Sequence, residues 1–191
     1  AIEALNDGEH GEFFALYLDL INRGYTVTPI GVSDSHGYRN GVGLNLTWLP
    51  VGLSSPTDLT DPVLVRRMRE GQTVVSRGPF LDARIDGVWA PGATFTGSQT
   101  LDITVHGPEF VQVDTLVLLE NGSEVDRIAT SSGGSFTLSP TADAHYVVVA
   151  SGSETMAPVY GDTPWAMTAA TRIDVDGDGW AAPLPPLGVG D

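Results

Sequence analysis

The feature that most constrains the fold is a change of hydrophobic periodicity near residue 80. Before this point, two segments are long enough for helices: 13–21 is apolar nearly all round and stops at Gly24, and 61–69 opens with Asp61 as N-cap and stops at Gly71. Strand candidates alternate with them at 2–5, 25–30, 44–49 and 73–76. Residues 1–79 are therefore predicted to form an α/β unit whose first helix is buried.

From residue 80 onwards the pattern is typical of an all-β protein. Short alternating segments recur between turns rich in Gly, Ser, Asp and Asn, and Asn121-Gly122 lies between two apolar runs as in a hairpin. These segments are 81–85, 101–105, 113–119, 135–138 and 146–150. The pattern predicts an immunoglobulin-like β-sandwich over residues 80–158. Residues 159–191 are predicted to be a closing segment with an Asp-rich loop and a Pro-rich tail.

The charge and the cysteine content exclude several classes of function. The formal net charge is −15, and all nine basic residues are arginines. Such a chain repels phosphate backbones and anionic membranes, so we expect neither nucleic acid nor a membrane as a partner. The chain has no cysteine, which excludes disulfides, thiolate catalysis and thiolate zinc sites. Acidity, the missing cysteines and the Asp-rich loop favour a secreted or periplasmic protein, with its targeting segment outside this sequence.

The best candidate for chemistry is the pair Asp34 and His36. They follow a β-branched run that ends at Ile30, between Gly31 and Gly37. Residues two apart in a strand point to the same face, so the carboxylate and the imidazole can converge at the strand's end. A carboxylate and an imidazole together suit a first-row divalent metal ion. An Asx-turn with a surface histidine explains the same residues without a metal.

Arginines and a second acidic cluster give further candidates. Arg39 and Arg77 are candidates for binding an anionic substrate at the mouth of the site, and pairing with a surface carboxylate is the alternative. Asp174, Asp176 and Asp178 are spaced like the first half of an EF-hand loop, so they are candidate Ca²⁺ ligands. A full EF-hand is excluded because the twelfth position is a proline, and a plain acidic turn is the alternative.

Four motifs, taken in order, resemble one family. The runs 1–6, 20–25, 31–36 and 69–79 resemble the C-terminal portion of a PHP-type metallohydrolase, in its CehA/McbA-like branch, and in that branch a β-sandwich follows the Gly-Pro at 78–79. The resemblance implies part of a (β/α)7 barrel that binds divalent Zn, Mn or Fe at the ends of its strands. It also implies phosphoesterase-like hydrolysis by a metal-activated water. Asp34 and His36 match the last metal motif, where both would be ligands and Asp34 would orient the water.

The sequence departs from that family in one important respect. The first metal motif of the family, a His-x-His, occurs nowhere in the chain. We therefore expect a C-terminal fragment that is inactive alone and whose exposed apolar surface is covered by a missing N-terminal segment or by self-association. The alternative is a non-catalytic, Ca²⁺-stabilised β-sandwich module that binds carbohydrate or protein.

Overall fold

The computed structural model describes residues 1–6, 11–36, 42–52 and 55–187. Its helices are α1 (Gly11–Asn22) and α2 (Asp61–Arg69), with a short 3₁₀ helix, η1 (Pro56–Asp58). The early strands are β1 (Ile2–Asn6), β2 (Pro29–Val32), β3 (Leu46–Trp48), β4 (Val74–Arg77), β5 (Phe80–Ile85), β6 (Val88–Trp89) and β7 (Thr94–Thr96). The later strands are β8 (Gln99–His106), β9 (Thr115–Glu120), β10 (Ser123–Ala129), β11 (Gly133–Leu138), β12 (Ala144–Ser151), β13 (Trp165–Thr168) and β14 (Thr171–Asp174).

Two sheets pack face to face, which confirms the predicted β-sandwich. The larger sheet has the order β10-β9-β12-β13-β4-β3, with β14 pairing β12 and β7, and the smaller sheet has the order β11-β8-β5-β6. The inward-facing side chains of both sheets form one core that includes Leu118, Phe136 and Tyr146. Asn121-Gly122 turns the β9–β10 hairpin as predicted, with positive φ at both residues.

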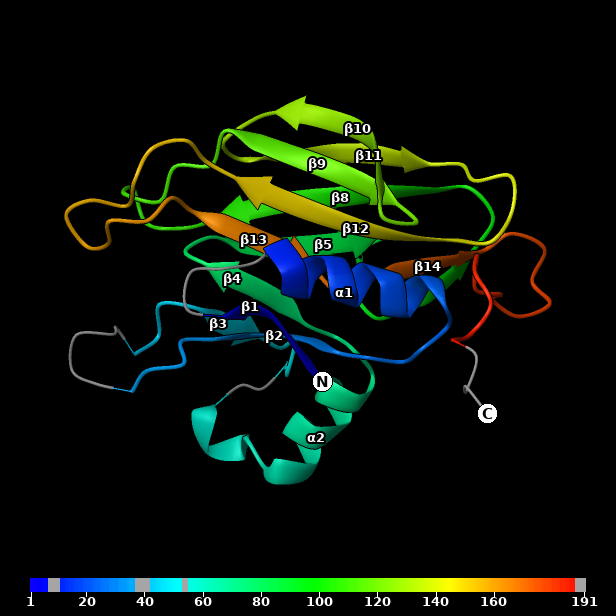
Figure 1. Ribbon diagram of the computed structural model, residues 1–191, viewed down its shortest axis with the longest axis horizontal. Coiled ribbons are helices and arrows are strands. Elements are labelled where there is room, and N and C mark those ends of the chain that lie inside the picture. Colours follow the sequence, from blue (N-terminus) through cyan, green and yellow to red (C-terminus); the bar gives the residue numbers. More distant parts are fainter. Residues whose placement is uncertain (7–10, 37–41, 53–54, 188–191) are drawn as a thin grey trace.

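The far face of the larger sheet carries a second apolar layer. Side chains of α1 and β1 pack there against Val75, Val147 and Met167, and α1 lies across β13 and β14 in Figure 1. The predicted burial of this helix is wrong, because among its residues only Tyr17 and Ile21 are buried. A helix that covers one face of a sheet buries one stripe of side chains, and the rest of its surface faces outward.

The N-terminal residues form a small parallel sheet. β1 pairs with β2, and the two strands end in register at Asn6 and Val32. The described residues show no strand on the other edge of β1. A PHP-type barrel is therefore not shown, because the described N-terminal residues form a parallel sheet of two strands, and the other parallel pair, β7 with β14, belongs to the sandwich.

The larger sheet also joins the three predicted segments of the chain. It contains β3 and β4 from residues 1–79, β9 and β12 from residues 80–158, and β13 and β14 from residues 159–191. The three-part division stays a prediction, and its parts share one hydrogen-bonded sheet. One detail of α2 differs from expectation: Thr60 is the N-cap, and Asp61 lies in the first turn, where its negative charge favours the helix N-terminus.

Candidate functional site

Asp34 adopts an unusual backbone conformation just after β2. Its φ is +43°, in the left-handed region that non-glycine residues avoid. The other described non-glycine residues with positive φ, Asp86 and Asn121, each precede a glycine in a hairpin turn. Asp34 follows a strand instead, and aspartate and asparagine are the non-glycine residues that adopt this conformation most readily.

The ring of His36 is oriented by the backbone of Asp34. Its Nδ1 lies 2.7 Å from the carbonyl oxygen of Asp34 and 3.3 Å from the carboxylate Oδ1. A carbonyl oxygen only accepts hydrogen bonds, so Nδ1 carries the proton. In the neutral ring the lone pair is then on Nε2, and the side chain is 78 % exposed. This is the tautomer and orientation in which metal-binding histidines are usually held.

The polar groups behind the turn hold it against the loop that follows. The amide of Gly43 donates to Ser33 Oγ over 2.9 Å, and Asn45 Nδ2 donates to the carbonyl of Val32 over 2.9 Å. Two buried amide oxygens, Asn6 Oδ1 and Asn45 Oδ1, have no hydrogen-bond partner among the described residues. An unsatisfied buried acceptor costs about 1–3 kcal/mol, so this region is short of donors or cations.

The donor types suit a divalent metal ion, but their arrangement does not present them to one ion, because the carbonyl and carboxylate oxygens of Asp34 lie beside His36 Nδ1, across the ring from Nε2. One carboxylate and one imidazole with a free Nε2 are ligands of the type that Zn, Mn and Fe accept. The orphaned oxygens of Asn6 and Asn45 add hard acceptors at the same edge. Within residues 1–6, 11–36, 42–52 and 55–187, no third His, Asp or Glu joins Asp34 and His36 in a metal-binding group.

The two candidate arginines have different outcomes. Arg39 lies outside the described residues. Arg77 is buried at the end of β4, and its Nε donates to the carbonyl of Thr163 over 3.1 Å. This places Arg77 in a structural contact between β4 and the closing segment.

The Asp-rich loop gathers a different triad from the one predicted. Oxygens of Asp143, Asp174 and Asp176 lie within 4.8 Å of one another. The sequence analysis missed Asp143, which precedes β12 and comes close because β12 pairs with β14. Asp178 lies beside the triad: its pKa is raised by a side-chain hydrogen bond with Asp176 and by the charge of Asp176.

Backbone amides already hold two of these carboxylates. Asp174 accepts from the amides of Gly177 and Gly179 over 2.8 Å and 3.0 Å. Asp143 accepts from the amides of Val175 and Ala181 over 2.9 Å and 2.6 Å. The carboxylates therefore shape the loop by themselves, and their mutual repulsion is the feature that a cation would relieve.

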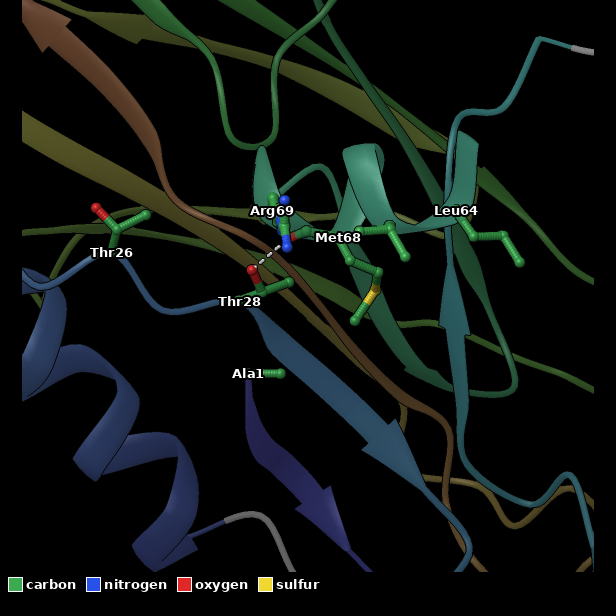
Figure 2. A pocket seen from close by; sticks show the side chains of 7 residues that line it. Ala1, Thr26, Thr28, Leu64, Met68 and Arg69 are labelled. Atoms are coloured by element: carbon green, nitrogen blue, oxygen red, sulfur yellow. Dashed lines mark hydrogen bonds between the residues drawn. The ribbon is translucent and has the colours of Figure 1, made fainter. Parts of the chain in front are cut away.

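A groove lies at the opposite end of β2 from Asp34. It has a volume of about 370 Å³ and runs between the start of the parallel sheet and α2 (Figure 2). Thr28 Oγ1 donates to the carbonyl of Met68 and ties the two walls together. Its lining is Ala1, Thr26, Thr28, Leu64, Val65, Met68 and Arg69. Because it holds no acid or base besides Arg69, the groove does not extend the Asp34 site.

One histidine of the sandwich is buried. His145 of β12 is fully buried and faces α1, with Nε2 2.7 Å from Asn22 Oδ1 and Nδ1 unpaired among the described residues. Burial, and then the positive charge of Arg172, lower the pKa of His145 to about 4. The ring is a structural group that stays neutral.

Comparison with known proteins leaves the family open. No protein-family profile and no curated protein matches the chain. A crystal structure of an engineered protein from a structural genomics consortium matches over 52 % of this chain and 20 % of its own length, with 17 % identity and a TM-score of 0.30. The chain thus spans about a fifth of that protein, and a likeness this low carries no argument. None of the described helices is both long and apolar enough to span a membrane.

Proposed function

We propose that the chain is the C-terminal part of a PHP-like, metal-dependent hydrolase of the phosphoesterase class. The observation that carries the proposal is the contact of His36 Nδ1 with the Asp34 carbonyl oxygen over 2.7 Å, which leaves Nε2 of this exposed side chain as the nitrogen available for a metal ion. Beside it, Asp34 occupies a left-handed turn at the carboxyl end of a parallel strand. Active sites of α/β proteins lie at this end of the strands.

In this mechanism the residues of the chain would bind the metal ion and orient its coordinated water. A divalent Zn, Mn or Fe ion, when bound, supplies a Lewis acid and lowers the pKa of a coordinated water. His36 would offer Nε2 as a nitrogen ligand, and Asp34 would offer its half-exposed carboxylate. One ion held by both groups would need the ring to turn, because Nδ1 is now the nitrogen beside the Asp34 oxygens.

The surface of the N-terminal half supports the further proposal that another segment or chain completes the site. Phe13 and Leu16 of α1 are 41 % and 47 % exposed, and Val65 of α2 is 46 % exposed. The outer edge of β1 also has no strand beside it among the described residues. An open strand edge next to apolar side chains is a surface that proteins normally cover. Further barrel strands or a second copy would supply both the cover and the missing ligands.

The metal content of the purified chain tests the proposal. We expect Zn, Mn or Fe to co-purify or to bind on titration, and to be lost in Asp34→Ala and in His36→Ala. Asp176→Ala is the matched control, because it removes an exposed carboxylate from the other acidic cluster. Absence of all three metals from the wild-type chain, both as purified and after titration, would reject the hydrolase site.

A second candidate is favoured by the recruitment of Asp143 to the Asp-rich loop. We propose, as the alternative, a non-catalytic β-sandwich module that Ca²⁺ stabilises and that binds carbohydrate or protein. Asp143, Asp174 and Asp176 offer only oxygen ligands, the type that Ca²⁺ prefers. Calcium alone in the purified chain, lost with Asp176→Ala and retained with Asp34→Ala, would support the module over the hydrolase.

A further inference from the structure

The groove between α2 and the start of β2 has an apolar wall that stays partly exposed. Its volume of about 370 Å³ is within the usual range of small-molecule sites. Leu64 and Met68 lie four residues apart on α2, so they share one face of the helix and form this wall (Figure 2). Both side chains are only half-buried, and α2 buries none of its residues. Such a wall favours a ligand with an apolar body.

Arg69 adds one positive charge to the same groove. Among the described lining residues it is the only one with an ionisable side chain. Its guanidinium makes no hydrogen bond or ion pair with any described residue. The neighbouring carboxylate of Glu70 is already shared, because Arg66 Nε lies 3.0 Å from its Oε1 and Arg67 Nη1 lies 3.4 Å from its Oε2. The charge of Arg69 is therefore available to an anion from solution.

An arginine without a partner is exceptional in so acidic a chain. The chain has 24 acidic residues and nine arginines, and its formal net charge is −15. Every other arginine in the described ranges contacts a carboxylate, a backbone carbonyl or an aromatic ring; besides those beside Glu70, these are Arg23, Arg77, Arg84, Arg127 and Arg172. One guanidinium on a negatively charged protein suits a ligand with one negative charge better than one with several. The planar fork of the guanidinium matches a carboxylate.

We propose that this groove binds a small amphipathic monocarboxylate, with its apolar chain against Leu64 and Met68 and its carboxylate on Arg69. The inference is independent of the proposed hydrolase function, because the groove lies at the opposite end of β2 from Asp34. Thr28 Oγ1 donates to the carbonyl of Met68 and joins the two walls. The groove is therefore formed before the ligand enters, which lowers the cost of binding.

Decanoate titrated onto the whole chain, labelled with ¹³C at its methionine methyl groups, tests the inference by NMR. The chain has three methionines. Met68 lines the groove, whereas Met156 and Met167 are buried outside it. We expect the Met68 signal, identified with Met68→Leu, to shift to saturation while the other two signals stay in place. From hexanoate to decanoate, each buried CH₂ should tighten binding about fourfold.

Arg69→Gln separates recognition of the anion from the apolar contact. It should weaken decanoate binding about fivefold, the upper end for an exposed ion pair, and leave the binding of 1-decanol unchanged. Arg127→Gln is the matched control, because it removes the same charge from an exposed ion pair with Glu124 on β10, the strand at the far edge of the larger sheet. This control should bind both compounds like the wild type.

Three results would overturn the inference. A Met68 signal that decanoate does not move would refute the site. Equal decanoate affinity in Arg69→Gln and the wild type would show an apolar groove that does not recognise the anion. A dimer by light scattering that binds no decanoate and becomes monomeric in Leu64→Asp would show that a second copy covers the groove. Asp34→Ala should bind decanoate like the wild type, so the outcome for the groove is separate from that for the metal site.

Discussion

Acidification should destabilise the chain through His145. The neutral ring donates from Nε2–H to Asn22 Oδ1, while its buried Nδ1 has no partner among the described residues. A proton on Nδ1 would be buried without an acceptor and repelled by Arg172, so the pKa falls from 6.5 to about 4 on folding. Stability from this group is fully present above pH 6.5 and is lost as the pH falls toward 4. Between about pH 7.5 and about pH 5 the loss amounts to about 2 kcal/mol.

Urea unfolding of the wild type and of His145→Gln at these two pH values measures the effect. The glutamine amide keeps a donor toward Asn22 and does not titrate. Carboxylates titrate in both proteins, so the difference between their pH dependences isolates the histidine. We expect the wild type to lose about 2 kcal/mol more than the variant. Equal losses in the two proteins would show that the ring is protonated in the folded state and would refute the reasoning.

Three further outcomes follow from the structure. Tyr17→Phe removes the hydroxyl that accepts from the buried amide of Ala170 over 2.9 Å, and should lower the free energy of unfolding by about 1–3 kcal/mol in urea titrations. Gly133→Ala places a Cβ 2.1 Å from the carbonyl oxygen of Ile103 at a φ of +134°, so its melting temperature should fall sharply, and an unchanged value would contradict the β8–β11 register. Under the calcium alternative, millimolar Ca²⁺ should raise the melting temperature of the wild type and not of Asp176→Ala, as scanning calorimetry would show.

The sequence predicted elements with strong local signals. The alternating segments became β5, β8 and β11, because alternation matches a sheet with one face toward a core. The more continuously apolar segments became β9 and β12, which lie in the larger sheet between two apolar layers. The helix over 61–69 was also predicted to within one residue at its start, where Thr60 and not Asp61 is the N-cap, since Pro62 and Gly71 delimit it. The predicted burial of α1 was wrong, because an apolar segment does not show how many faces of the helix will pack against other elements.

Contacts between residues far apart in the chain could not be predicted from the sequence. Asp143 joins Asp174 only through the pairing of β12 with β14, which no local pattern announces. The hydrogen bond from Asn45 to Val32 spans thirteen positions. The sheet that joins β4 to β13 is equally non-local. The Asp-x-His spacing did predict two neighbouring side chains, but for the wrong reason: β2 ends at Val32, so the two residues do not share a strand face, and they meet in the turn at Asp34.

The most direct test of the account is a crystal structure of the chain soaked with Mn²⁺, with anomalous data collected above the manganese edge. The account predicts an anomalous peak at the Asp34 turn, bound by His36 and the Asp34 carboxylate. A peak confined to Asp143, Asp174 and Asp176, with the Asp34 turn empty, would contradict it and leave the calcium-stabilised module as the better description.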